Sequence, residues 1–250
     1  MTASPEPQRR ILVAVDVEKY SRRENLQQYR MQEDFRLVLQ QGADRLGLDR
    51  RAWLIQVAGD GELAVLPAPA SEPRVVAHLV PVLDRLLRER NAGLPGERRI
   101  RVRVAVHVGL VHVDGAKGFP GAAAVTVSRL VGARPVKLAL AAFPAAGAAL
   151  ILSEQVFDDV VAQRYEDMAP DAFTRVRIEV PDKEFDQAAW ISVPGSAPAD
   201  LARILADFQF STPAPISPAP GNSGRIESMT THGPAVIGDH GQAVQINNRF

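Results

Sequence analysis

The sequence contains no cysteine among its 250 residues. Disulfides, thiolate metal sites and cysteine nucleophiles are therefore excluded. The sequence also has no surplus of charge, because Lys plus Arg and Asp plus Glu both number 29. Proteins that bind nucleic acid or an anionic membrane surface usually carry a basic surplus, so we expect neither partner.

Long apolar runs are missing as well. No stretch approaches the roughly 20 residues of a membrane-spanning helix, and the N-terminal segment MTASPEPQRR contains no apolar core of a signal peptide. We therefore expect a cytoplasmic location. The rest is ordinary for a globular protein, with 46% hydrophobic and 23% charged residues. The length suffices for one α/β domain and a tail.

The hydrophobic pattern alternates between the periods of strands and helices. It predicts the order β-α-β-β-α-β-α-β-α-β-β, which contains the βαββαβ core of a ferredoxin-like α/β (α+β) fold. The predicted strands are 11–17, a hairpin over 53–66, 101–113, 150–152, 173–180 and 185–193. The predicted helices are 22–46, 73–91, 122–142 with a break near Pro135, and 153–165.

Composition divides the chain into four parts. Residues 1–9 are expected to be disordered, and 10–210 to form one globular domain. Residues 211–230 are rich in Pro, Ser and Gly, which is typical of a flexible linker. Residues 231–250 remain as a short C-terminal motif.

Two carboxylates stand where neighbouring strands end. Asp16 closes the strand 11–17, and Asp60 lies in the turn of the hairpin. In a ferredoxin-like core these strands are adjacent, so the carboxylates are expected to converge and to hold two Mg²⁺ or Mn²⁺ ions on a nucleoside triphosphate. The alternative is that Asp16 only caps a strand and Asp60 only makes a turn.

Five segments in order resemble the catalytic domain of class III adenylyl and guanylyl cyclases. A further segment, 135–140 (PVKLAL), resembles a related group of cyclase-like domains found beside effector modules in actinomycete proteins. The five segments span most of 10–193. Together they cover the two metal motifs, a strand leading into His-x-Gly, the end of the catalytic helix, and the next strand and helix start. The segments are 15–21 (VDVEKYS), 58–65 (AGDGELAV), 103–111 (RVAVHVGLV), 128–130 (SRL) and 149–157 (ALILSEQVF).

This resemblance implies a function for each matching residue. Asp16 and Asp60 would be the metal ligands. Arg129 would stabilise charge on the phosphate in the transition state, for which a bidentate guanidinium is suited. Lys183 would assist Arg129, or else is only a turn residue. Because Asp16 and Arg129 would come from different subunits, the resemblance also implies a homodimer.

The sequence departs from the family where the nucleoside would be read. At the position where the family has an Asn that orients the ribose, this sequence has Val125. At the position where the family has an acidic or similar group that reads the base, this sequence has Ala122. The base-reading position before Asp60 is Gln56, which does not choose clearly between purines. Thr126 supplies a hydroxyl beside this position, and a shift of register would let it replace the missing amide. Two hypotheses follow: a weak cyclase acting on a purine nucleoside triphosphate, or a degenerate domain that binds nucleotide or only dimerises.

The C-terminal residues 233–248 combine β-prone residues with Gln and Asn and carry few charges. Such segments can stack in register with amide ladders. They resemble short amyloid-signalling motifs that recruit an effector protein. The alternatives are a disordered tail and an additional edge strand.

Overall fold

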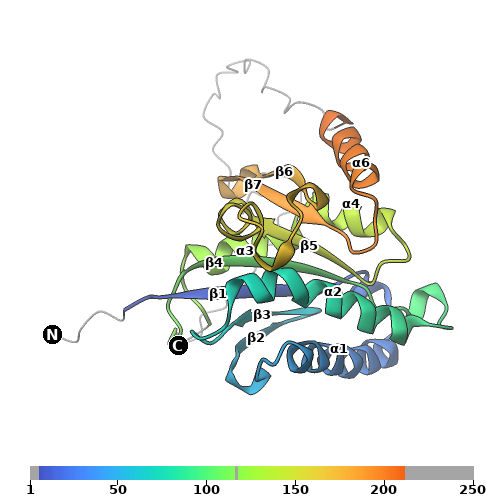
Figure 1. Ribbon diagram of the computed structural model, residues 1–250. Helices are drawn as coiled ribbons and strands as arrows, with labels where there is room; N and C mark the ends of the chain where they lie inside the picture. Colours follow the sequence, from blue (N-terminus) through green and yellow to red (C-terminus); the bar gives the residue numbers. More distant parts are fainter. Residues whose placement is uncertain (1–5, 116–117, 212–250) are drawn as a thin grey trace, which may run out of the picture. The chain divides into compact units, whose positions relative to one another are not determined.

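The computed structural model describes residues 6–115 and 118–211. Its centre is a seven-stranded mixed sheet in the order β2-β3-β1-β4-β5-β7-β6 (Figure 1). The strands are β1 (Gln8–Val17), β2 (Leu54–Ala58), β3 (Gly61–Val65), β4 (Val102–Val111), β5 (Ala148–Ser153), β6 (Thr174–Val180) and β7 (Phe185–Ser192). The α-helices are α1 (Asn25–Arg45), α2 (Glu72–Asn91), α3 (Ala122–Gly132), α4 (Arg134–Ala142), α5 (Glu154–Val156) and α6 (Pro198–Ser211).

The first half of the sheet confirms the ferredoxin-like prediction. Strands β2, β3, β1 and β4 lie side by side in that order, and each neighbouring pair is antiparallel. Helices α1 and α2 connect them in the βαββαβ sequence. Strand β5 then pairs with β4 in parallel, and β7 and β6 extend the sheet by antiparallel pairing.

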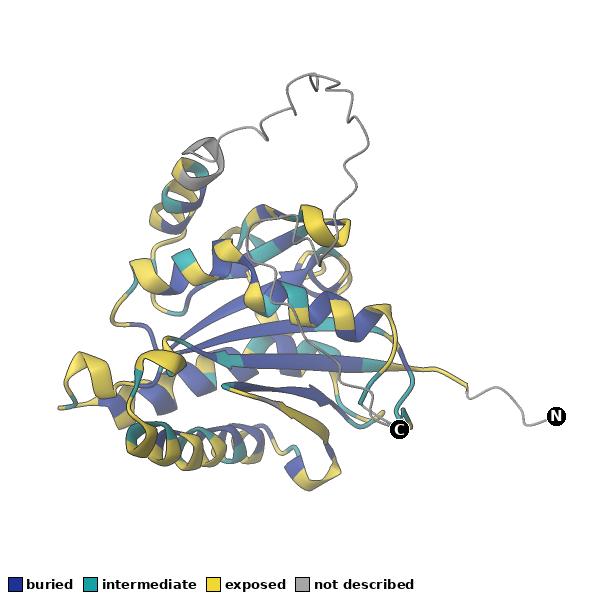
Figure 2. Cartoon of the chain, turned by 180° about the vertical axis from the view of Figure 1, so that it is seen from behind, coloured by how far each residue is buried: buried dark blue, intermediate teal, exposed yellow. Residues whose placement is uncertain are grey.

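Side chains alternate along β1 between two hydrophobic cores, one on each face of the sheet. Ile11, Val13 and Val15 belong to the core that α1 and α2 cover. Leu12 and Ala14 belong to the core that α3, α4 and α6 cover. Figure 2 shows the central strands buried between helices whose outer faces are exposed. A period of two on a strand buried on both faces explains why the segment is continuously apolar.

The two edges of the sheet differ in chemistry. On β2, Leu54, Ile55 and Val57 are 44%, 38% and 77% exposed. On β6, Arg175 and Arg177 are exposed instead. Charged side chains protect an edge strand from pairing with another chain, whereas exposed apolar side chains leave it available.

Several local predictions can be compared with the structure. The hairpin turn consists of Gly59 and Asp60, and the break near Pro135 lies at Ala133, between α3 and α4. The predicted helix 153–165 is wrong in length. Ser153 does cap it, but α5 passes into a π-helical turn at Phe157–Val161, and Arg164, Glu166 and Asp167 then have positive φ angles. Helix α6 was not predicted. The predicted motif 231–250 lies outside the described residues.

Candidate functional site

Asp16 lies near the end of β1, between two neighbouring strands. Its cross-strand partners are Gly61 on β3 and Arg103 on β4. The Arg103 guanidinium forms an ion pair with the Asp16 carboxylate, with Nε 3.1 Å from Oδ2. Burial raises the pKa of Asp16 above its ordinary value, although the positive charge of Arg103 lowers it. The carboxylate is therefore kept in the fold at a cost in desolvation.

The β2–β3 turn places Asp60 beside Asp16. Gly59 has a φ of +57°, which a glycine adopts without strain, and the Asp60 carbonyl accepts a hydrogen bond from the Val17 backbone N–H at 3.1 Å. A Cβ on Gly61 would lie 2.1 Å from the Val15 carbonyl oxygen, so glycine is required where β3 approaches β1. The charge of Asp60 contributes to the raised pKa of Asp16. The structure thus brings the two predicted metal-binding carboxylates together.

These two residues fit a hard divalent cation by their chemistry. The described residues contain no group of three or more His, Asp and Glu side chains that could enclose a metal ion. Mg²⁺, however, is commonly bound through one or two carboxylates together with substrate phosphates, so two aspartates suffice when a triphosphate supplies the rest. Arg103 already neutralises part of the charge of Asp16 and would compete with a cation there.

A second set of predicted residues lines a separate cavity of about 900 Å³ over α3. Gln56, Arg129 and Lys183 all border it, so the structure brings these three together. The Arg129 guanidinium lies over the Phe185 ring, 4.9 Å from its centroid. Val125 also lines this cavity and is 45% exposed. Neither Asp16 nor Asp60 is among its lining residues.

The comparison with known proteins rests on structure alone. No profile of a known protein family and no curated protein matches the sequence. The adenylate/guanylate cyclase/hydrolase from Silicibacter pomeroyi superposes with a TM-score of 0.55 and 18% identity, over 76% of this chain and 98% of that one. The chain has the fold of a class III nucleotidyl cyclase catalytic domain.

Two further solved structures are similar at lower scores. One is the guanylate cyclase domain of RhGC from Catenaria anguillulae in complex with GTP, with a TM-score of 0.49 and 14% identity over 78% of this chain and 100% of that one. The other is a bacterial light-regulated adenylyl cyclase, with a TM-score of 0.49 and 9% identity over 81% of this chain and 99% of that one. The similarity to the Silicibacter pomeroyi structure confirms, for the fold, the resemblance seen in the sequence motifs.

Thr126 lies elsewhere in this cyclase fold. It is only 8% exposed, and it borders a different hollow that also contains His107. Successive helix residues point about 100° apart, so the residue after Val125 leaves the cavity that Val125 lines. The structure therefore does not bring Thr126 together with Gln56, and replacement of the missing amide by Thr126 is not supported.

Two of the histidines, His107 and His112, lie on β4 or directly after it. His107 Nδ1 lies 2.8 Å from the Ser153 hydroxyl oxygen, and Ser153 also accepts from the Val156 N–H as the cap of α5. Burial lowers the pKa of His107, and Arg9 lowers it further. His112 follows the end of β4. The contact of His107 with Ser153 suits a histidine with a structural function.

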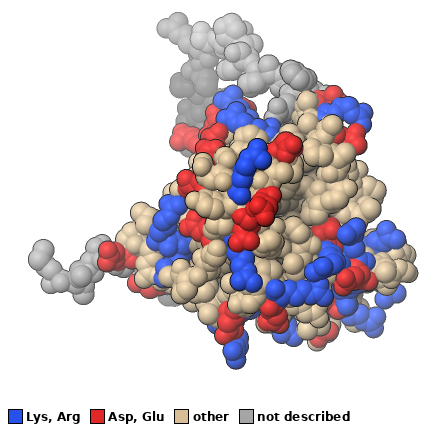
Figure 3. Space-filling view, in the orientation of Figure 1, with Lys and Arg blue, Asp and Glu red and all other residues tan. Residues whose placement is uncertain are grey.

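Arg103 is the site residue that the sequence analysis missed. Within the alternating segment of β4 it looks like any outward charge, and only the antiparallel register places it opposite Asp16. Nearby, Arg101 and Glu18 lie 3.4 Å apart at the same end of the sheet. Over the face seen in Figure 3, acidic side chains lie among the basic ones. Local pairs, rather than a broad field of one sign, therefore set the electrostatics.

No helix in the described part of the chain has both the length and the apolar character needed to cross a bilayer.

Proposed function

We propose that this cyclase fold acts on a purine nucleoside triphosphate with Mg²⁺ or Mn²⁺ and forms a cyclic nucleotide slowly. The observation that carries the proposal is the convergence of Asp16 and Asp60 at one end of the sheet. Neither carboxylate is needed to fill a core, and the burial of Asp16 raises its pKa at a cost to the fold. A retained pair of this kind fits a cation and a triphosphate better than a purely structural function.

Asp16 and Asp60 do not line the α3 cavity of their own subunit, and this separation favours a homodimer. The carboxylates lie at the β2–β3 turn, and Arg129 and Lys183 line the cavity over α3. We propose that the carboxylate half of one subunit faces the α3 cavity of its partner, which would complete a site by two-fold symmetry. Leu54, which lies on the α3 face of β2, and Val125 on α3 supply exposed apolar surface that such an interface would bury.

Ring closure would join the ribose 3′ oxygen to the α-phosphorus and break the bond between that phosphorus and the oxygen bridging to the β-phosphate. Pyrophosphate would leave with this oxygen, and the 3′ hydroxyl proton would pass to solvent. Asp16 and Asp60 would hold the divalent ions, which neutralise phosphate charge and favour the attacking oxygen. Arg103 would leave Asp16 and face the phosphates once a cation takes its place. Arg129 would donate to the phosphate oxygens that gain charge, with Lys183 beside it, and Gln56 would meet the base edge through its amide.

The proposal is tested by a metal-dependent turnover assay against all four nucleoside triphosphates. We expect slow product formation from ATP or GTP with Mn²⁺ or Mg²⁺, and loss of both turnover and metal-dependent binding in the double variant Asp16→Asn, Asp60→Asn. A matched control is Asp44→Asn together with Asp158→Asn, since both residues are exposed and far from the turn in sequence. Equal binding by the wild type and the site variant contradicts the proposed metal site.

A second candidate function rests on Val125. This side chain projects into the α3 cavity where a hydrogen-bonding group would hold the ribose, and an isopropyl group offers none. In this alternative the domain binds nucleotide, or only dimerises, and transmits a signal. Nucleotide binding without any turnover, or a dimer that forms without nucleotide affinity, would favour it over the enzyme.

The C-terminal residues 233–248 enter both functions as a proposed recruitment motif for an effector protein. Val244 and Ile246 would share one face of an extended strand, with Gln245 and Asn247 on the other. A peptide of these residues is expected to form fibrils that bind amyloid dyes, and Ile246→Pro to prevent it. A peptide that stays soluble and monomeric at high concentration contradicts this proposal.

A further inference from the structure

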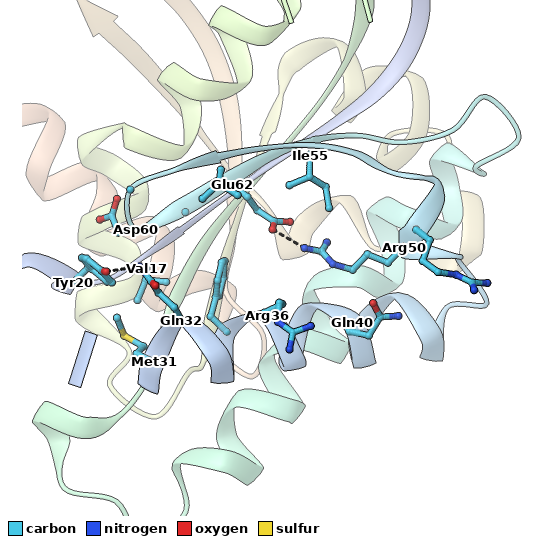
Figure 4. A pocket seen from close by; sticks show the side chains of 15 residues that line it. Val17, Tyr20, Met31, Gln32, Arg36, Gln40, Arg50, Ile55, Asp60 and Glu62 are labelled. Carbon is cyan, nitrogen blue, oxygen red and sulfur yellow. Dashed lines mark hydrogen bonds and ion pairs between the residues drawn. The ribbon is translucent and has the colours of Figure 1, made fainter. Parts of the chain in front are cut away.

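A cavity of about 420 Å³ lies between α1 and the β2–β3 hairpin, on the face of the sheet opposite α3 (Figure 4). Met31 and Phe35 of α1 form one wall, and Ile55 and Val57 of β2 form the other. The turn that carries Asp60 closes one end. The size and the apolar walls match those of sites for small organic molecules.

Eight of the lining residues are polar, and they comprise three arginines, two glutamines, Tyr20, Asp60 and Glu62. Arg50 is 7% exposed, and its Nη2 lies 2.6 Å from the Glu62 carboxylate, whose side chain is 8% exposed. The guanidinium carbon of Arg50 is 5.3 Å from the centroid of the Trp53 ring. Within the described residues the Arg50 Nη1 has no hydrogen-bond partner. A buried guanidinium with an unused donor is a costly arrangement unless another acceptor arrives.

A second cation lies on the α1 side. Arg36 lines the cavity and is exposed, and among the residues that the structure describes it has no ion-pair or hydrogen-bond partner. The other basic lining residue, Arg51, is held by Asp49 at 3.0 Å. Two acidic residues, Asp60 and Glu62, offset part of this charge. Arg51 is paired with Asp49 and Arg50 with Glu62, so within the described residues Arg36 is the basic lining residue without an acidic partner.

We propose that this cavity binds a small amphipathic monoanion, a single carboxylate on an apolar body such as a medium-chain acid. The carboxylate would pair with Arg36 and accept from Arg50 after a small movement of its side chain, and the chain would lie between Phe35 and Ile55. A nucleoside triphosphate does not fit this chemistry, because it carries several negative charges. The proposal goes beyond cyclase activity and does not depend on it.

The test measures binding of octanoate to the full chain by isothermal titration calorimetry, without nucleotide or metal. Octanol, which has the same chain without the charge, is the comparison ligand. We expect octanoate to bind about tenfold more tightly than octanol, since charge-assisted hydrogen bonds contribute roughly 1.5–3 kcal/mol, and tenfold equals about 1.4 kcal/mol.

Two variants locate the site, each with a control. Arg36→Gln should weaken octanoate binding about fivefold without changing octanol binding, whereas Arg30→Gln, exposed on the same helix and not lining the cavity, should have no effect. Ile55→Trp should fill the cavity and weaken both ligands about tenfold or more. Leu54→Trp, the exposed neighbour that does not line the cavity, is its control.

Thermal unfolding verifies that each variant folds, and both tryptophan substitutions are at exposed positions of an edge strand. Three results would overturn the proposal. They are no saturable octanoate binding below its micelle concentration, equal affinity for octanoate and octanol, and unchanged octanoate affinity in both Arg36→Gln and Ile55→Trp.

Discussion

The two halves of the candidate site are built in different ways. Asp16 and Asp60 are fixed by the backbone, through the pairing of β1 with β3 and β4 and a two-residue turn. Val125 and Lys183 project from exposed positions of a helix and a turn. A change in the first half disturbs the sheet, whereas a change in the second half alters only a surface.

This difference explains where the sequence departs from a complete cyclase site. An exposed helix position accepts Asn or Val with little effect on folding, so only function would select between them. The carboxylate of Asp16 is different, because burial raises its pKa and makes its charge unfavourable to the fold. The Asp16 carboxylate also has a structural partner in Arg103, so its place in the fold serves an ion pair as well as the approach of Asp60.

The largest expected effect comes from completing the weaker half. In the variant Val125→Asn, turnover should rise about 10²-fold or more, because one missing transition-state contact typically costs about 10²–10³ in rate. Ala122 borders the same hollow as Thr126 rather than the α3 cavity. Steady-state product formation measures the rise in turnover. Leu110→Asn, an exposed apolar residue at 60% exposure outside the α3 cavity, is the control for added polarity.

No gain in a folded Val125→Asn variant, or a wild-type turnover that is already fast, would show that the ribose is not held at position 125. The alignment of α3 with the catalytic helix of the family would then be wrong.

Within the α3 cavity, Arg129 should matter more than Lys183. Arg129→Ala is expected to lower kcat about 10²-fold, since a guanidinium on a phosphate acts in the transition state. Arg129→Lys should recover only part, because an ammonium lacks the bidentate geometry. Lys183→Ala, at an exposed turn, is expected to change kcat less than about fivefold. Equal losses at both positions would contradict this ranking.

The backbone-built half should respond in stability. Gly61→Ala places a Cβ against the Val15 carbonyl and should lower the free energy of unfolding by about 1–3 kcal/mol. Gly96→Ala is the matched control, because nothing lies within 4 Å of a Cβ there. It should leave stability unchanged or raise it by about 0.4–1 kcal/mol. Denaturant unfolding measures both. If the two variants are equally stable, β3 can move away from β1 and the carboxylate geometry is not rigid.

The smallest expected effect is a pH dependence at His107, on the same strand as Arg103. Burial and then Arg9 lower its pKa, so the unfolded chain takes up a proton at higher pH than the folded chain. Stability should therefore fall as the pH drops below about 6.5, by at most about 1.4 kcal/mol per pH unit. His107→Gln should flatten this slope. A slope unchanged by His107→Gln would assign the acid sensitivity to other groups.

The sequence predicted most of the fold because its strong signals are local. The Asp-Gly hairpin, the alternation on β4 and the proline break between α3 and α4 all depend on neighbours in the chain. The ion pair of Asp16 with Arg103 joins residues whose alignment depends on strand register, which composition does not reveal. The direction in which Thr126 points depends on the helical phase of α3. As the residue after Val125, it borders another hollow rather than the α3 cavity.

The unprotected edge at β2 has a consequence for how the molecule opens. Leu54, Ile55 and Val57 are exposed, and β2 has one neighbouring strand, so its outer amides should exchange with deuterium first among the strands. Because β3 and the Asp60 turn are attached to β2, fraying there would loosen the carboxylates long before the centre of the sheet unfolds. A partner that covers this edge would slow exchange and hold the site in place, so the exchange rate of one short strand would report assembly of the site.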